Sequence, residues 1–203
     1  TASSTGATNK TVTCSGTVTA QPVTPGVSIA LASGSNPACA GSSVSFTASP
    51  SNTGGGTVSY QWKVNGNNTG TNNAVFTSST LQNNDQISCV INITGGNVTT
   101  NTAASNSITM TVNALPTTPV AGNNGPVCVG STLQLTSNAT GTISWTGPNK
   151  FTSTLQNPVI TNVSAAAAGT YYVTSNNGTC TSLAGSTVVT INAATSITTQ
   201  PAN

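Results

Sequence analysis

The chain has 203 residues and only four charged side chains, namely Lys10, Lys63, Lys150 and Asp85. Charged residues make up 2% of the sequence, against roughly 25% in an average soluble domain. With no imidazole and a single carboxylate, the chain cannot build a Ser/His/Asp relay, a Cys/His pair or a paired acid and base. We therefore expect no enzyme activity, no nucleic-acid binding, no metal and no cofactor.

The polar fraction consists of Thr, Ser, Asn and Gly instead of charge, and apolar residues make up 35%. Thr and Val favour strands, while Asn and Gly favour turns, so the composition predicts an all-β fold. No apolar run reaches the roughly 18 residues of a membrane span, and no basic-then-apolar leader opens the chain. We expect a mature, exported protein without a membrane span.

The first strand predicted along the chain lies in an N-terminal segment, residues 1–24, that belongs to neither later domain. Its residues alternate between apolar and polar side chains, which is typical of a half-buried strand. The strand comprises Thr11, Val12, Thr13, Cys14, Ser15, Gly16, Thr17, Val18, Thr19 and Ala20. It is similar to segments 108–113 and 188–192, which end the two later domains. Three interpretations are open: the tail of a preceding repeat, a strand donated to a neighbouring subunit, or an extra edge strand within the molecule.

Alternating segments continue through the rest of the chain, separated by Gly, Asn and Ser turns. The strands predicted first in the chain are 27–31, 44–48, 58–64, 74–77, 86–93 and 107–112. The later strands are 132–136, 142–145, 159–163, 170–174 and 187–191. The run 165–168 between two of the later strands predicts one helical turn or a tight loop.

An internal repeat relates the two sets of strands. Cys39-Ala-Gly-Ser-Ser-Val-Ser-Phe recurs as Cys128-Val-Gly-Ser-Thr-Leu-Gln-Leu, and Phe76-Thr-Ser-Ser-Thr-Leu-Gln-Asn recurs as Phe151-Thr-Ser-Thr-Leu-Gln-Asn. Proline linkers of the same form lie at 22–25 and 116–119. Two copies of one β unit follow, which we place at 26–114 and 119–195, with 196–203 as a linker-like tail.

Each copy has a central tryptophan, Trp62 or Trp145, and Tyr171 lies in a pattern that resembles the tyrosine corner of immunoglobulin-like domains. Six or seven strands in about 90 residues predict a sandwich of that class. Trp62, Trp145, Tyr60 and Phe46 could be imagined as a sugar-stacking platform, but at alternating strand positions they are expected to be core residues, and Tyr171 is expected to belong to the core as well. Asp85, in an Asn-rich stretch, is expected to form a turn instead of a calcium site.

The five cysteines lie at 14, 39, 89, 128 and 180, and none forms a C-x-x-C pair. The spacings predict one long-range disulfide in each copy, Cys39–Cys89 and Cys128–Cys180, and so an oxidising, extracytoplasmic setting. Cys14 is then left over as a free thiol, a half of an intermolecular bond, or a buried side chain on an apolar strand face.

Three phrases resemble a known family. They are Cys39-Ala-Gly-Ser-Ser-Val-Ser-Phe-Thr-Ala, Tyr60-Gln-Trp-Lys-Val-Asn-Gly and Ser105-Asn-Ser-Ile-Thr-Met-Thr-Val-Asn, and they look like the Ig-like or PKD-like repeats of bacterial cell-surface and gliding-type adhesins. The similarity covers residues 26 to about 195. It implies an extracellular, non-enzymatic structural or adhesive role.

From these features we predict a secreted subunit that polymerises with itself into a pilus-like surface filament by donating the strand 11–20. The alternative is a stalk fragment of a long adhesin that binds carbohydrate or protein elsewhere. Attached glycans would help so uncharged a surface to stay in solution. The sequons for such glycans are Asn9, Asn67, Asn92, Asn97, Asn138, Asn162 and Asn177.

Overall fold

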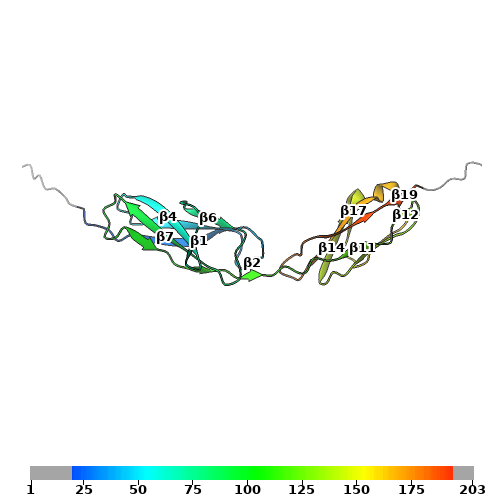
Figure 1. Cartoon of the computed structure of the whole chain (residues 1–203), viewed down its shortest axis with the longest axis horizontal. Helices are drawn as coiled ribbons and strands as arrows, with labels where there is room; N and C mark the ends of the chain where they lie inside the picture. Colours follow the sequence, from blue (N-terminus) through cyan, green and yellow to red (C-terminus); the bar gives the residue numbers. More distant parts are fainter. Residues whose placement is uncertain (1–19, 194–203) are drawn as a thin grey trace, which may run out of the picture.

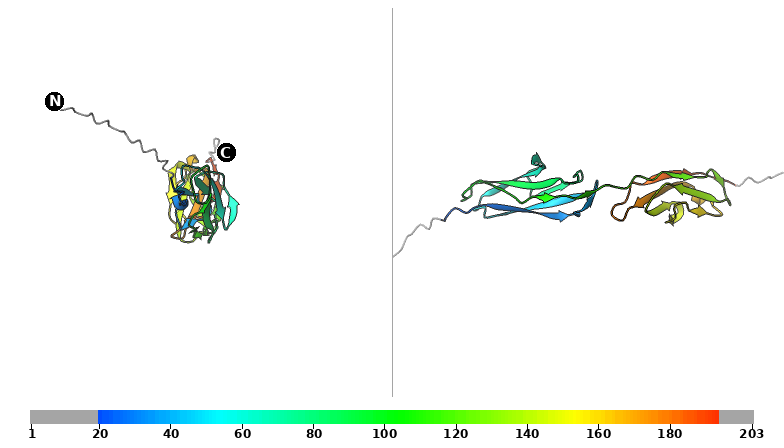
Figure 2. Two further views of the ribbon diagram at one scale, coloured as in Figure 1. Left: turned by 90° about the vertical axis from the view of Figure 1, so that its left-hand side faces the viewer. Right: turned by 90° about the horizontal axis from the view of Figure 1, so that it is seen from below.

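The computed structural model describes residues 20–193, which form two β-sandwiches arranged end to end (Figure 1). The view from below shows the two units in a line, and the end-on view shows one unit in front of the other (Figure 2). Apart from two short 3-10 turns, all regular structure in this part of the chain is strand. The predicted all-β fold of two tandem immunoglobulin-like sandwiches is confirmed. The predicted N-terminal strand lies outside the described residues, except for Ala20, which is not in a strand.

The first unit, residues 26–113, is a sandwich of two antiparallel sheets closed by one short parallel pair. One sheet has the order β1-β3-β6, the other runs β5-β4-β7-β8 with β9 also on β7, and β2 pairs with β10. The bounds of these strands are β1 Gly26–Ser33, β2 Ala38–Cys39, β3 Val44–Ser51, β4 Thr57–Val64, β5 Asn67–Thr69, β6 Val75–Ser78, β7 Gln86–Thr94, β8 Thr102–Ala104, β9 Ile108–Thr109 and β10 Val112–Asn113.

The core of the first unit follows from strict alternation along its central strands. In β7 the residues Ile87, Cys89, Ile91 and Ile93 are buried, while the residues between them are not. Trp62 of β4 lies opposite Cys89, is fully buried, and donates its indole N–H to the Asn73 carbonyl at 2.9 Å. Aromatic side chains of this size dominate the energetics of small cores.

The second unit, residues 121–192, repeats this plan with fewer and shorter strands. Its sheets have the orders β11-β13-β16 and β15-β14-β17-β18, and β12 pairs in parallel with β19. The bounds are β11 Ala121–Asn123, β12 Val127–Cys128, β13 Leu133–Ser137, β14 Thr142–Gly147, η1 Pro148–Lys150, β15 Phe151–Ser153, β16 Val159–Ile160, η2 Ala165–Ala167, β17 Gly169–Asn176, β18 Gly185–Val189 and β19 Ile191–Asn192.

Trp145 and Tyr171 lie at the centre of the second core, and both are fully buried. The Tyr171 hydroxyl donates a hydrogen bond of 3.0 Å to the Ala167 carbonyl, four residues earlier in the chain. This bond is the tyrosine corner that the sequence pattern indicates. The alanine run before it forms the 3-10 turn η2, in agreement with the helical turn predicted there.

Each long strand of the structure overlaps one predicted strand, whereas the strands β2, β5, β8, β11, β12 and β15 have no predicted counterpart. These strands have two or three residues each, too few to show an alternating pattern. Two of them, β2 and β12, carry cysteines. The short strands are therefore the part of the fold that the sequence pattern did not predict.

Candidate functional site at the junction of the two sandwiches

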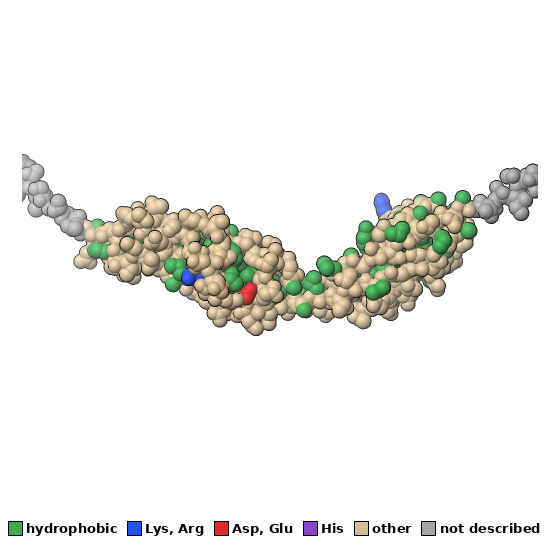
Figure 3. Space-filling view, in the orientation of Figure 1, with side chains coloured by type: hydrophobic (Ala, Val, Ile, Leu, Met, Phe, Trp, Pro, Cys, Tyr) green, Lys and Arg blue, Asp and Glu red, His purple; other side chains and the backbone are tan. Residues whose placement is uncertain are grey.

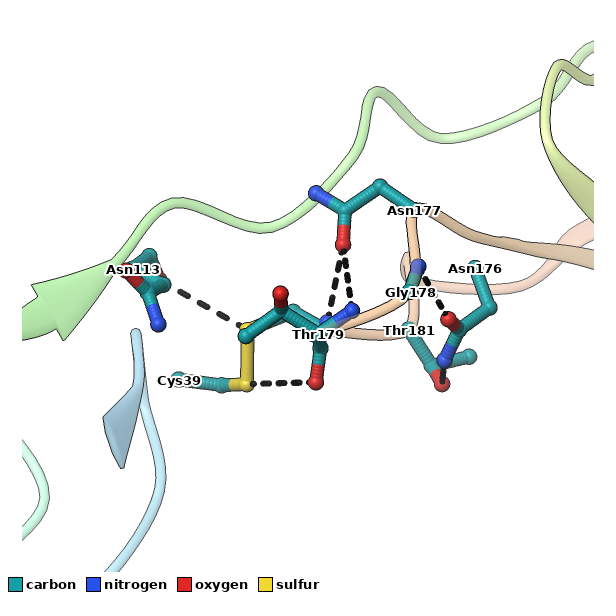
Figure 4. Close-up of a disulfide and its surroundings, with 8 residues drawn as sticks. Cys39, Asn113, Asn176, Asn177, Gly178, Thr179 and Thr181 are labelled. Carbon is teal, nitrogen blue, oxygen red and sulfur yellow. Dashed lines mark hydrogen bonds between the residues drawn. A yellow bond between two sulfur atoms is a disulfide. The ribbon is translucent and has the colours of Figure 1, made fainter. Parts of the chain in front are cut away.

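A disulfide bond between Cys39 and Cys180 links the two sandwiches (Figure 4). The two Cα atoms lie 5.8 Å apart although 141 residues separate them in sequence. Cys39 ends β2 at the junction end of the first unit, and Cys180 lies in the loop between β17 and β18 (Figure 1). The bond therefore joins the end of one unit to a loop of the next.

The predicted pairings Cys39–Cys89 and Cys128–Cys180 are wrong. Cys89 points into the core from the middle of β7, whereas Cys39 lies at the end of the unit. In the second unit, Cys128 lies on β12 at the end far from the junction, and Cys180 lies near the junction (Figure 1). The strand β17 between these ends is about 26 Å long at roughly 3.3 Å per residue, and a disulfide spans at most about 7 Å between Cα atoms.

The first unit positions Cys39 through its last strand. In the parallel pair β2–β10, Cys39 lies opposite Asn113, the last strand residue before the linker. The Ala40 N–H donates to the Asn113 carbonyl at 2.9 Å, and the sulfur of Cys180 lies 4.0 Å from the same oxygen. The site is thus built where the chain leaves the first unit.

The second unit positions Cys180 through side-chain hydrogen bonds that fold its loop. Asn177 Oδ1 accepts the backbone N–H groups of Thr179 and Cys180 at 3.1 and 2.9 Å. Asn176 Oδ1 accepts the Gly178 N–H at 2.7 Å, and Gly178 has a φ of 93°. Asparagine side chains that accept nearby backbone N–H groups fix tight turns. The loop therefore presents Cys180 and the Thr179 carbonyl, 3.6 Å from the sulfur of Cys39, in one conformation.

The peptide linker makes a second attachment beside the disulfide. Pro119, at its end, is buried, and its carbonyl oxygen lies directly against Gly185 at the start of β18. A Cβ at position 185 would overlap this oxygen, so only glycine permits so close an approach. The linker is thereby held on the surface of the second unit.

The remaining described cysteines have no disulfide partner within residues 20–193. Cys89 is fully buried, and this burial raises the pKa of its thiol above the ordinary value of 9.0. It is an inert core side chain. Cys128 is exposed at the far end of the second unit. Cys14 lies outside the described residues.

Asp85 forms a turn, as predicted. Its two carboxylate oxygens accept hydrogen bonds from the Gln82 N–H at 2.8 Å and from Asn65 Nδ2 at 2.7 Å. Within residues 20–193, His, Cys, Asp and Glu side chains form no group of three or more that could hold a metal. A small hollow of about 140 Å³ beside Tyr171 is lined mostly by apolar side chains such as Phe151 and Ile160.

The surface is polar but almost uncharged, as the space-filling view shows (Figure 3). All six sequons in the described chain have exposed asparagines: Asn67, Asn92, Asn97, Asn138, Asn162 and Asn177. Asn97 uses its amide nitrogen to donate to the Ala20 carbonyl at 2.7 Å. Among the described residues there is no helix long and apolar enough to cross a membrane.

No family model matches the chain, and no curated protein matches it in sequence. Solved structures of tandem immunoglobulin-like domains do match. Three N-terminal domains of the bacteriophage RB49 Highly Immunogenic Outer Capsid protein are 16% identical, with a TM-score of 0.39, over 81% of this chain and 59% of that one. The mouse nectin-like molecule 4 ectodomain is 12% identical, with a TM-score of 0.34, over 88% and 67%. The Ig1-2 module of the Drosophila receptor protein tyrosine phosphatase DLAR is 16% identical, with a TM-score of 0.29, over 85% and 96%.

Proposed function

We propose that the chain is an extracellular, non-enzymatic structural element, a rod of immunoglobulin-like units whose relative orientation is fixed by a disulfide. The observation that carries this proposal is the Cys39–Cys180 bond across the junction. A disulfide within one unit would stabilise that unit only. A bond between units constrains how one unit lies against the next, which is a mechanical role.

Two attachments restrain the junction more than either would alone. The linker by itself would let the second unit bend and rotate about one point. The disulfide adds a second point, and the packing of Pro119 on Gly185 shortens the free linker to residues 114–118. The disulfide and the shortened linker together leave the second unit less freedom to bend and rotate than the linker alone would. The elongated arrangement in Figure 2 is what such a rod requires.

The composition fits an exported rod. Disulfides persist in oxidising compartments outside the cytoplasm. A surface with so few charges offers little electrostatic repulsion to close packing against identical neighbours. Glycans on the exposed sequons would keep such a surface in solution.

The rod proposal is tested by small-angle X-ray scattering of the oxidised chain and of the double variant C39S/C180S. We expect the oxidised chain to give one maximum dimension that matches the extended structure. The variant should keep both folds by circular dichroism but give a broader distance distribution with more compact conformers. Equal distributions for the two proteins would contradict the proposal, because the disulfide would then not set the orientation.

For assembly we propose that the N-terminal strand 11–20 is donated to a neighbouring copy to form a filament. Each sandwich already contains its own final strands, since β9 pairs with β7 and β18 pairs with β17. A donated strand would therefore add to an outer sheet edge, the mode called β-augmentation.

Electron microscopy of the native protein and of a chain lacking residues 1–24 tests this assembly. Filaments that require the segment support donation, and filaments that persist without it contradict donation. Isolated beaded rods in both samples would instead favour the stalk of a long adhesin.

A further inference from the structure

Cys128 occupies the same structural position in the second unit as the bonded Cys39 does in the first. Each is the last residue of a two-residue strand that pairs in parallel with the final strand of its unit. Cys39 lies opposite Asn113, and Cys128 lies opposite Asn192. Each of these asparagines is followed by an alanine in the sequence.

The backbone around the two cysteines is bonded in the same way. The Ala40 N–H donates to the Asn113 carbonyl at 2.9 Å, and the Val129 N–H donates to the Asn192 carbonyl at 3.0 Å. Each cysteine carbonyl then accepts the N–H of the serine three residues later, at 3.0 Å in both units. The end of the second unit is thus a second copy of the surface that docks the Cys180 loop at the junction.

Within residues 20–193 the first copy of this surface is occupied and the second is not. Cys39 is bonded to a loop of the next unit, whereas Cys128 is exposed and has no partner within residues 20–193. The Cys39–Cys180 bond is an independent observation, and it shows that a cysteine at this position bonds to a loop of the next unit. We propose that Cys128 forms a disulfide with the loop between the last two long strands of a further immunoglobulin-like unit, docked head to tail. This inference rests on the proposed rod function.

The partner must resemble the second unit of this chain, not the first. In the second unit the docking loop carries Cys180. In the first unit the corresponding β7–β8 loop has no cysteine. That loop instead bonds the preceding segment, because the Val23 N–H donates to the Asn97 carbonyl and the Thr99 N–H donates to the Val23 carbonyl. The first unit of a second copy therefore has no thiol at the required place, and we commit to a unit of the second type.

The bond forms by ordinary thiol–disulfide exchange with a low-molecular-weight disulfide as oxidant. The Cys128 thiolate attacks oxidised glutathione, forms a mixed disulfide and releases one glutathione. The loop thiolate of the incoming unit then attacks the sulfur of Cys128 and releases the second glutathione. The two protein thiols lose two protons and two electrons, and one glutathione disulfide is reduced to two thiols.

The test uses a three-unit chain. The test protein consists of the chain up to Ala193 followed by a second copy of residues 115–193. Since Asn192-Ala193 matches Asn113-Ala114, this fusion reproduces the natural linker between the units. After refolding in glutathione buffer, the bonds are mapped by mass spectrometry of non-reduced peptides. We expect Cys128 to be bonded to the Cys180 copy of the added unit. The effective concentration of the added unit's Cys180 thiol at Cys128 should be within about tenfold of the effective concentration of the original Cys180 thiol at Cys39 in the same molecule.

A matched control tests whether the disulfide requires a thiol at position 128 itself or only a thiol at this end of the unit. The variant C128S/V129C moves the thiol by one residue at the same end of the unit. We expect its effective concentration to be at least about a hundredfold lower. Equal values for the two chains, or a Cys128 that stays a free thiol while Cys39–Cys180 forms, would overturn the inference. Absence of the Cys39–Cys180 bond would instead overturn the proposed rod function.

The native protein gives a second readout. Peptide mapping of native material should find Cys128 bonded to a cysteine from the corresponding loop of another immunoglobulin-like unit. A bond from Cys128 to Cys14 of a second copy, or a free Cys128 thiol, would contradict the inference.

Discussion

The two units share a plan but close the same corner of the sandwich with different chemistry. Trp62 pairs with Cys89 across the first sheet, and Trp145 pairs with Val173 across the second, so Cys89 and Val173 are equivalent. Two residues earlier the second unit has Tyr171, whose hydroxyl reaches Ala167. The first unit has Ile87 there.

In the first unit the nearby turn is held by Asp85 and Asn65 instead. Asp85 accepts from Asn65 Nδ2 at 2.7 Å, and Asn65 Oδ1 accepts the Gln86 N–H at 2.9 Å. Asp85, the only acidic side chain in the sequence, therefore holds this turn of the first unit, whereas the Tyr171 hydroxyl holds the corresponding corner of the second unit. The repeat therefore specifies the tryptophan-centred core and the terminal parallel pair, whereas the corner differs between the two units.

The largest effect should come from the tryptophans, because they are the largest side chains in each core. We expect Trp145→Ala to destabilise the second unit by about 3–5 kcal/mol, while the first unit stays folded around Trp62. Since Trp62 is then the sole tryptophan, its fluorescence during urea unfolding reports the first unit alone. Loss of the cooperative Trp62 transition in this variant would show that the two cores do not fold separately. The milder Trp145→Phe serves as the control.

The next effect concerns the disulfide. When the second unit unfolds next to a folded first unit, the bond closes the loop from Asn113 to Cys180, which are separated by 67 positions in the sequence. On the chain-entropy model such a closure contributes roughly 4 kcal/mol. We expect C39S/C180S to lower the stability of the second unit by roughly 2–4 kcal/mol, measured by differential scanning calorimetry that resolves the transitions of the two units. An unchanged midpoint would mean that the unfolded unit is not constrained by its neighbour. Reduction of the wild-type chain is the matched control.

A smaller effect is expected at the corner. Tyr171→Phe removes the hydroxyl that donates to Ala167 and leaves the ring in place, so we expect a loss of about 1 kcal/mol from the second unit. The first unit, which has no tyrosine corner, should be unaffected. Differential scanning calorimetry that resolves the two transitions checks this. A shift in the first transition would contradict the assignment of the corner to one unit.

The smallest effect is a difference in alkaline stability. Burial raises the pKa of the Cys89 thiol, so above its ordinary value of 9.0 the unfolded chain ionises while the folded chain does not. The contribution of the neutral Cys89 thiol to the stability of the first unit is therefore fully present below about pH 9. It is lost as the pH rises further. Burial likewise raises the pKa of Tyr171 above its ordinary 10.0, so the corresponding decline in the second unit begins later.

The control for this pH effect is Cys89→Val, which gives the first unit the residue found at the equivalent position of the second. Urea midpoints from pH 8 to pH 10 should then lose the cysteine-dependent slope. A slope that is the same in wild type and variant would assign the alkaline decline to other groups.

Much of the fold was predictable because it depends on local patterns. Alternation in segments such as 86–93 identifies the long strands, and the repeated phrases around Cys39 and Cys128 reveal two units. Trp62, Trp145 and Tyr171 lie in the cores because large aromatics at alternating positions must face inward. Asp85 in an Asn-rich stretch signals a turn, and its hydrogen bonds form that turn.

The disulfide was not predictable from spacing. Similar spacings within each half suggested Cys39–Cys89 and Cys128–Cys180, but spacing carries no information about which end of a sandwich a residue occupies. The useful signal was the repeat itself. Cys39 and Cys128 are equivalent, whereas Cys89 is equivalent to Val173 and Cys180 has no counterpart in the first unit, so the two presumed pairs could not be copies of one bond.

By itself, then, the sequence determined an all-β chain of two immunoglobulin-like units with almost no charge. The tertiary structure decided that the disulfide joins the units and that Cys128 lies at the equivalent position of the second unit. The physical reason is that strand patterns are set by near neighbours in the chain, whereas a disulfide requires two Cα atoms within about 7 Å. That distance is fixed only when both sandwiches and the linker between them have folded.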